Sequence, residues 1–277
     1  MLRGFKALDR VLRGEATRIS DLKTGTVDIP ANLLLFVLAM LGMVAGACTG
    51  VFAVITRYHT DPENAIMGWE QLFASTVKVP LLFGLTLLIT FPSLYVFNAL
   101  VGSRLSMMAM LRLLVAALCV MMAVLSSLGP IVAFFAVSTT SYPFMKLLNV
   151  VAYAIAGALG LSFLLQTLHR LSVAQGEAEI LDEPGGPPPL PPDEDAPPPY
   201  PSNPIPGALR PIALRTVDPR VRTIFRIWVI VFGLVGAQMG WILRPFIGNP
   251  TQPFEWFRPV DSNFFQAVWR SLENLFQ

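Results

Sequence analysis

The sequence predicts an all-α fold: a polytopic helical membrane protein with about five transmembrane helices and further amphipathic helices at the membrane interface. The chain of 277 residues is 54% hydrophobic and only 14% charged, which is too little charge to cover a soluble domain of this size. Long apolar runs recur along the chain, and lysine and arginine concentrate in alternate connections between them. Together these observations indicate that lipid surrounds most of the chain.

Each apolar run has about the length that a helix needs to cross the hydrocarbon core, roughly 20 residues. The runs are residues 33–55, 80–101, 111–137, 147–168 and 224–246. Two of them contain a proline that should disturb the helix. Pro92 predicts a kink midway through the second run, and Gly129-Pro130 predicts a bend or break near the end of the third.

The chain divides by composition into regions of different character. These are a basic cytoplasmic segment at 1–29, a four-helix transmembrane region at 30–171, a disordered proline-rich linker at 172–223, a fifth transmembrane helix at 224–247 and an outer interfacial helix at 248–277. The first segment and the linker are rich in basic residues, whereas the alternate connections hold few, Arg57, Lys78 and Lys146. The positive-inside rule then predicts a cell (inner) membrane protein with its N-terminus in the cytoplasm and its C-terminus outside.

Three short segments have an apolar stripe at helical spacing and are expected to lie in the membrane interface. The N-terminal stripe is Leu2, Phe5, Leu8 and Leu12, opposite basic residues. The second helix starts at Asp61-Pro62, a favourable cap, and its stripe is Ile66, Trp69, Leu72, Phe73, Thr76 and Val77. The third stripe is Phe264, Phe265, Val268, Trp269, Leu272, Leu275 and Phe276.

Glycines recur every four residues in two of the runs. They are Gly42, Gly46 and Gly50 in the first run, and Gly236 and Gly240 in the fifth. Small residues on one stripe let two helix backbones approach closely, which is how helices associate in lipid. Two interpretations stay open: a seam between copies of the chain in a homo-oligomer, or packing inside one subunit, for example of the first span against the fifth.

The proline-rich linker is the segment with recognisable partner chemistry. It includes Pro197-Pro198-Pro199-Tyr200, which matches the PPxY form that WW domains bind as a polyproline II helix. A spacer that joins the fourth and fifth spans explains the same composition. The sequence therefore allows a cytoplasmic protein partner at these four residues.

The interior of the predicted spans is notable for the side chains it lacks. As the runs are drawn, no Asp, Glu, Lys, Arg or His falls in the middle of one, although ion-coupled transporters need such a group. Amides, hydroxyls and helix kinks remain as lining for a channel or permease path. The candidate lining residues for this alternative are Thr90, Pro92, Asn98 and Gln238.

No catalytic, cofactor-binding or metal-binding residue set emerges from the sequence. The two histidines, His59 and His169, fall on opposite sides of the membrane in the predicted topology, so they cannot share a metal ion. No glycine-rich loop with a lysine follows a strand, so no phosphate-binding loop is expected. The net charge of +2 is too small to indicate binding of nucleic acid.

Two segments carry a resemblance to known membrane proteins. They are Lys78-Val79-Pro80-Leu81-Leu82 continuing through Pro92-Ser93-Leu94-Tyr95 to Asn98 and Gly102, and Gly240-Trp241-Ile242-Leu243-Arg244-Pro245-Phe246-Ile247-Gly248. They resemble a group of uncharacterised bacterial polytopic inner-membrane proteins, over the second to fifth spans without the linker. In span number and in its proline-rich cytoplasmic segment the chain is also similar to Yip1-like membrane proteins. Neither resemblance implies a catalytic residue.

The expected function is that of a non-enzymatic multi-pass membrane protein, a scaffold or a subunit of a membrane complex. Its expected partners are the lipid bilayer, other membrane or cytoplasmic proteins and, through the glycine stripes, a second copy of the chain. No cofactor is expected. A channel or permease component, with the kinked second and third spans lining a path, is the alternative.

Overall fold

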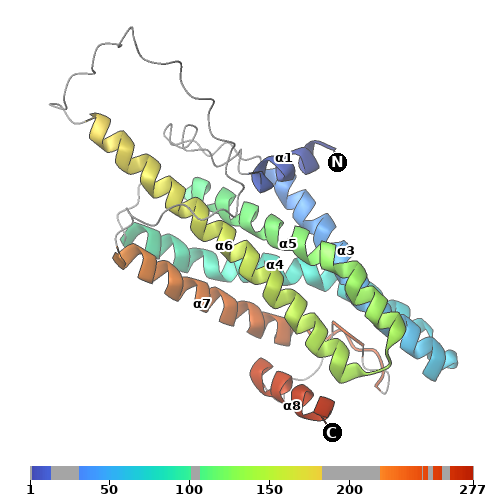
Figure 1. The fold of residues 1–277 in the computed structure, drawn as a ribbon. Coiled ribbons are helices and arrows are strands. Elements are labelled where there is room, and N and C mark those ends of the chain that lie inside the picture. The colour runs from blue at the N-terminus through green and yellow to red at the C-terminus, as the bar shows by residue number, and fades with distance from the viewer. Residues whose placement is uncertain are drawn as a thin grey trace, which may run out of the picture.

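The protein is a bundle of long helices (Figure 1). A computed structural model describes residues 2–13, 31–100, 107–182, 219–244, 246–248, 252–257 and 263–276. In chain order its elements are α1 (Leu2–Leu12), α3 (Ala31–Thr60), the short 3-10 helix η2 (Pro62–Asn64), α4 (Ile66–Leu100), α5 (Met107–Ser138), α6 (Tyr142–Asp182), α7 (Pro219–Ile242) and α8 (Phe264–Phe276). These residues contain no strand, so the all-α prediction is confirmed for the part of the chain that is described.

Four of the helices are long and apolar enough to cross a membrane, which confirms the multi-pass prediction. Their candidate spans are Asn32–Thr60, Ile66–Ser93, Leu111–Ser138 and Tyr142–Thr167. In α7 the described apolar stretch is shorter, Ile230–Ile242, although the whole helix has 24 residues and is therefore about 36 Å long. That α7 is a fifth span stays a prediction.

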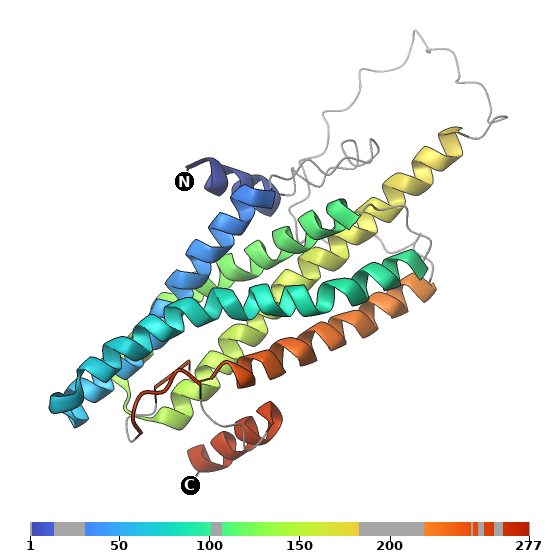
Figure 2. The ribbon, with the colours of Figure 1, turned by 180° about the vertical axis from the view of Figure 1, so that it is seen from behind.

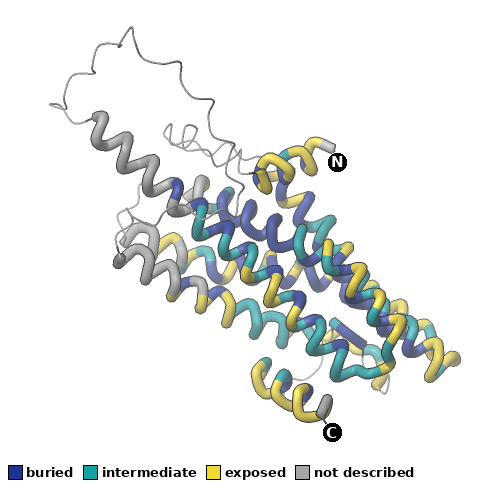
Figure 3. Tube along the Cα trace, viewed as in Figure 1, coloured by how far each residue is buried: buried dark blue, intermediate teal, exposed yellow. Residues whose placement is uncertain are grey.

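The first turns of α4 direct apolar side chains outward and polar side chains inward. Figure 3 shows that buried and exposed residues alternate along the helices of the bundle. Trp69 and Phe73 are 62% and 60% exposed, whereas Gln71, Ser75 and Lys78 are buried. A water-soluble helix has the opposite distribution. In lipid, apolar side chains face the solvent, and polar groups must find partners inside the protein. The burial pattern of α4 therefore fits a membrane protein.

The sequence predicted a separate interfacial helix after Asp61-Pro62, and this prediction is wrong. Asp61 precedes η2 and accepts a hydrogen bond from Asn64 Nδ2 at 2.9 Å. From Ile66 the chain continues in one helix through Pro80 and Pro92 to Leu100. Prolines are tolerated inside a transmembrane helix because neighbouring groups satisfy the freed carbonyls. The helical residues 66–77 and the second apolar run thus form one element.

The predicted break in the third span is also absent. Helix α5 is continuous through Gly129 and Pro130 to Ser138. Gly129 lies close to α3, where an added Cβ would stand 2.9 Å from Cys48 Sγ. The small residue at this place therefore serves the contact between α3 and α5 rather than a break.

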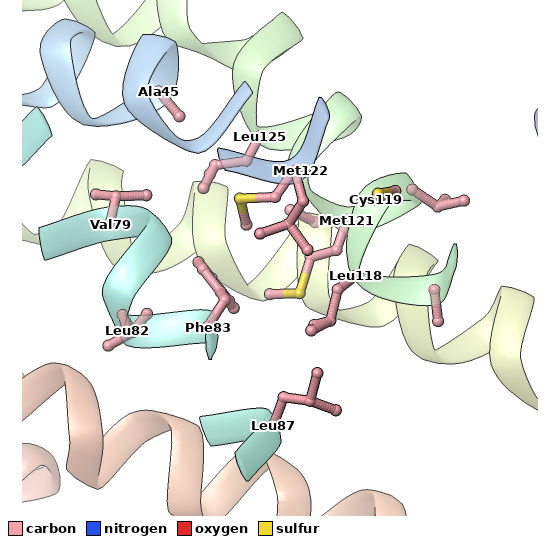
Figure 4. Packing of buried hydrophobic residues seen from close by; sticks show 14 of the residues in the cluster. Ala45, Val79, Leu82, Phe83, Leu87, Leu118, Cys119, Met121, Met122 and Leu125 are labelled. Carbon is pink, nitrogen blue, oxygen red and sulfur yellow. The ribbon is translucent and has the colours of Figure 1, made fainter. Parts of the chain in front are cut away.

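Helix α5 forms the centre of the core. Every residue from Leu113 to Met122 is buried, because α5 packs against α1, α3, α4 and α6. Figure 4 shows part of this core, with side chains from α3, α4 and α5. At Gly160 of α6 the contact with α5 is especially close, since a Cβ there would lie 2.8 Å from Met121 Cβ.

Both glycine stripes pack inside the chain, and both pack on α4. The stripe of α3 faces α4 so closely that a Cβ on Gly46 would lie 2.8 Å from Thr76 Cα, and one on Gly50 would lie 2.7 Å from Leu72 Cα. Gly236 and Gly240 of α7 face α4 at ordinary contact distance, 3.7 and 3.6 Å from side-chain atoms. Figure 2 shows α7 lying along α4. Helices α3 and α7, which hold the predicted first and fifth spans, therefore pack on α4 rather than on each other.

The linker is shorter than the composition had indicated. Helix α6 continues to Asp182, and α7 already begins at Pro219, so both ends of the predicted 172–223 linker are helical. Residues 172–182 contain two Ala, two Glu and one Leu, which favour helix, and the next proline along the chain is Pro184. The prolines at 197–199 and Tyr200 lie outside the described residues.

One side of helix α1 packs on the bundle, and the other side faces outward. Gly4, Leu8 and Val11 are buried against α3 and α5, and a Cβ on Gly4 would lie 2.7 Å from Val37 Cγ2. Phe5 is 44% exposed, on the flank of the same apolar stripe. Part of the predicted surface stripe therefore packs on the protein.

The close approach of α3 and α4 can be tested at Gly46. In Gly46→Ala the new methyl group meets the α4 backbone, and overpacking of this kind costs about 1–3 kcal/mol. We expect a clear drop in melting temperature in detergent, measured by circular dichroism. The matched control is Gly84→Ala, since no atom lies within 4 Å of a Cβ there and alanine favours helix. Equal stability of Gly46→Ala and Gly84→Ala would contradict the packing described.

Candidate functional site: buried cations that hold the C-terminal strap

After α7 the chain returns across the helices at one end of the bundle. We call residues 246–257 the strap; it is described at 246–248 and 252–257. The end where it lies also contains η2, the start of α6 and helix α8, and we call it the C-terminal end of the bundle (Figure 1). Polar side chains from α3 and α4 contact the strap there.

Lys78 of α4 is the more deeply buried of the two cations that contact the strap. Its side chain is 1% exposed. The ammonium group donates a hydrogen bond to the carbonyl oxygen of Trp256 and lies 5.8 Å from the centre of the Trp256 ring and 5.0 Å from that of Phe257. A cation over aromatic faces gains electrostatic attraction from the ring quadrupole. The strap therefore surrounds this lysine with an acceptor and two rings.

Arg57 of α3 holds the strap at a second point. It is 5% exposed, and its Nη2 donates to the carbonyl oxygen of Gln252. Its Nη1 lies 3.6 Å from Met67 Sδ, near the start of α4. A charged donor strengthens such a bond, so each cation contributes about 1.5–3 kcal/mol to holding its carbonyl.

Two neutral side chains fix the beginning of the strap. Gln71 Nε2 donates to the Phe246 carbonyl at 3.2 Å, and Ser75 Oγ donates to the same oxygen. The two residues lie one helical turn apart on α4, which brings both donors to one acceptor. Gly248 fits between Ala53 and Gln71, where a Cβ would meet atoms of both at 2.9 Å. A larger residue would lift the strap from the bundle.

The hydrogen bonds leave an aromatic surface on the outside of the strap. Trp256 and Phe257 are 45% and 58% exposed. The Trp256 ring packs edge to face with Phe73 of α4 at 6.3 Å and with Phe254 at 6.0 Å. Aromatic rings of this kind are enriched at the level of lipid headgroups. The arrangement therefore fixes a rigid aromatic platform.

The candidate pore residues do not share one path in the described part. Thr90 Oγ1 donates to the carbonyl of Thr86 in its own helix at 2.7 Å, and Pro92 is exposed. Gln238 is half-buried on α7, and the side chain of Asn98 lies outside the described residues. Between α4, α5, α6 and α7 there is a cavity of about 20 Å³ lined only by apolar residues and glycine.

The described residues offer no group of three His, Cys, Asp or Glu side chains close enough to hold a metal ion. Cys48 and Cys119 are separate thiols in this part of the chain. The polar chemistry of the C-terminal end is hydrogen bonding to backbone carbonyls.

Sequence reasoning missed Arg57 and Lys78 as site residues. It counted them as charges of a connection outside the first two spans, whereas both lie inside long helices. The available signal was a polar stripe, Gln71, Ser75 and Lys78, at the spacing of one helix face and opposite the apolar stripe. The strap carbonyls that these donors bind have no signature in the sequence.

Fold and site together define an all-α, multi-pass membrane protein in which a C-terminal strap is held by buried cations. No family model, no curated protein and no solved structure matches the chain. The resemblance to bacterial polytopic and Yip1-like membrane proteins therefore stays a prediction.

The role of Lys78 can be measured through backbone hydrogen exchange. Lys78→Met keeps the apolar stem but removes the donor to Trp256, a loss of about 1.5–3 kcal/mol. We expect amide exchange at residues 252–257 to rise about tenfold or more by mass spectrometry. The control is Arg270→Met, a cation exposed on α8. If amide exchange in the strap of Lys78→Met were the same as in the wild type, Lys78 would not be what holds the strap in place.

Proposed function

We propose that this protein is a non-enzymatic scaffold or subunit of a complex in the cell (inner) membrane. The observation that carries the proposal is the strap: four polar side chains from two helices bind the chain's own backbone carbonyls and hold an aromatic platform. Polar groups used in this way keep a surface in a fixed position. A surface fixed in advance loses little entropy on binding a partner.

The proposed orientation has the N-terminus and the proline-rich linker in the cytoplasm and the platform outside. The distribution of basic residues supports it, since the N-terminal segment and the linker region are rich in arginine. In this orientation the protein offers one binding segment on each side of the membrane. The cytoplasmic one is Pro197-Pro198-Pro199-Tyr200, whose form suits a WW-type domain.

A homo-oligomer is not proposed through the α3 glycines, because α4 covers them. The partners proposed are lipid and other membrane or cytoplasmic proteins. The wide apolar surfaces of α4 and α7, such as Leu88 and Ile230 at 69% and 62% exposed, support contact with lipid or with another membrane helix.

Partner binding by the linker is tested by purification from native membranes in mild detergent. We expect proteins that co-purify with the full chain to be lost when residues 184–211 are replaced by a Gly/Ser segment of equal length. Tyr200→Ala should lose the same proteins, and Tyr58→Ala, an exposed tyrosine of α3, should retain them. Identical partner sets for all variants, identified by mass spectrometry, would remove the linker from the proposal.

The orientation is tested with single cysteines in a chain that carries Cys48→Ala and Cys119→Ala. A membrane-impermeant maleimide added to intact cells should label Glu63→Cys, in the exposed η2, and spare Ser202→Cys in the linker. Permeabilised cells should show labelling at both positions. Labelling of both in intact cells would place them on one side and refute the topology.

A further inference from the structure

Helix α1 has three faces, and one of them packs on the protein. Gly4, Leu8 and Val11 form this packed face, against α3 and α5. Phe5 and Leu12 lie two helical turns apart on a second face, where they are 44% and 41% exposed. An amphipathic helix that turns such a face away from the protein in a membrane turns it toward lipid.

The third face of α1 is basic. Arg3, Lys6 and Arg10 follow one another at steps of three and four residues, so they share one side of the helix, and all three are exposed. Asp9, the acidic residue of this helix, accepts a hydrogen bond from Arg13 at 3.0 Å. That ion pair compensates the charge of Asp9. The other cations therefore give the face a net positive charge.

The contacts of Gly4 place α1 at the beginning of the first candidate span. A Cβ on Gly4 would lie 2.7 Å from Val37 Cγ2 and 3.4 Å from the carbonyl oxygen of Leu33. Both residues belong to the first two turns of α3, whose candidate span begins at Asn32. Figure 1 shows α1 beside this beginning of α3. The ends of a span meet the lipid headgroups, so α1 lies at headgroup depth.

Helix α8 has a similar arrangement at the opposite end of the bundle, but its polar face is not basic (Figure 1). Ala267 is buried against the bundle, whereas Phe265 and Trp269 are exposed. The polar face holds Arg270 and Glu273, whose charges cancel. An anionic surface therefore attracts α1 and not α8. Comparison of the two helices separates an effect of charge from an effect of apolar contact alone.

We propose that α1 binds the anionic headgroups of the bilayer surface, with Phe5 and Leu12 at the edge of the acyl chains and Arg3, Lys6 and Arg10 on lipid phosphates. Charge complementarity favours this occupant, because each cation near an anionic membrane surface strengthens binding about fivefold. In the proposed orientation α1 lies on the cytoplasmic side, where the membrane surface is negative. The inference deepens the proposed contact with lipid and is separate from the protein partners of the linker.

The test compares amide hydrogen exchange of the full chain in nanodiscs of phosphatidylglycerol and of phosphatidylcholine, measured by mass spectrometry. We expect exchange in α1 to be about tenfold slower in phosphatidylglycerol, because lipid bound to the docked helix opposes its local opening. Exchange in α8 should be the same in both lipids. Salt at about 1 M should remove the difference in α1, since it screens exposed charges.

Variants test the basic face and the apolar face separately. Arg3→Gln, Lys6→Gln and Arg10→Gln combined should make exchange in α1 equal in the two lipids, because glutamine removes the charge and keeps a high helix propensity. The matched control is Arg270→Gln on α8, which should retain the difference in α1. Phe5→Ser should speed exchange in α1 in both lipids, because it removes an apolar group from the acyl region.

Equal exchange of wild-type α1 in the two lipids would overturn the proposal, as would a difference that survives in the triple-glutamine variant. If inorganic phosphate slowed exchange in phosphatidylcholine as much as phosphatidylglycerol does, the face would belong to a free anion. Slow exchange in native membranes but in neither nanodisc would assign it to a protein. Unchanged exchange in Phe5→Ser would take the second face out of the lipid.

Two features of the design keep the test decisive. If the triple-glutamine variant does not fold, which raised exchange throughout α3 to α6 would reveal, the wild-type comparison and its salt dependence decide. Co-purification of proteins through the linker is a separate measurement. It is expected to be the same whether or not α1 distinguishes the two lipids, so failure of this inference and failure of the scaffold proposal are distinguishable.

Discussion

A polar side chain buried in a membrane protein has no water to bind, and this constraint orders the C-terminal end of the bundle. Helix α4 carries Gln71, Ser75 and Lys78 on one face, and the cost of exposing them to hydrocarbon turns that face toward the protein. The chain then supplies acceptors from its own strap, at the carbonyls of Phe246 and Trp256. Carbonyls left open by an irregular segment and donors left open by a buried helix face satisfy each other. The strap thus supplies acceptors for the buried donors of α4, and α4 supplies donors for the carbonyls of the strap.

Close packing of the helices depends on glycines at the contacts with α4 and α5. The α3 glycines let two backbones approach to a distance that no side chain permits, and Gly160 does the same between α6 and α5. Gly248 has the corresponding role in the strap. Since lipid is as apolar as the side chains, van der Waals contact between closely spaced backbones replaces the hydrophobic effect as the force that joins these helices. The four-residue spacing of glycines, which in the sequence also allowed a seam between two copies of the chain, serves helix packing within one subunit.

The C-terminal end gathers Arg57, Lys78, Lys146 and Arg244, each beside an aromatic ring or a backbone carbonyl. Cations held among aromatic rings suit the headgroup region, where phosphates and carbonyls of lipid supply further acceptors. This end, fixed by hydrogen bonds, presents an aromatic surface at Trp256 and Phe257, whereas the flanks of α4 and α7 expose apolar side chains such as Leu88 and Ile230.

The sequence by itself determined the all-α, multi-pass architecture, because runs of apolar residues long enough to cross a bilayer leave few other solutions. It also identified the glycines as contacts, since small residues at four-residue spacing form one helix face. Only the tertiary structure decided that both glycine stripes meet α4, that the helix after Asp61 is the start of α4, and that Arg57 and Lys78 are buried. The physical reason is that periodicity describes one helix at a time. Which neighbour covers a face, and which distant carbonyl accepts from a buried cation, depends on contacts between residues such as Lys78 and Trp256 that are far apart in the chain.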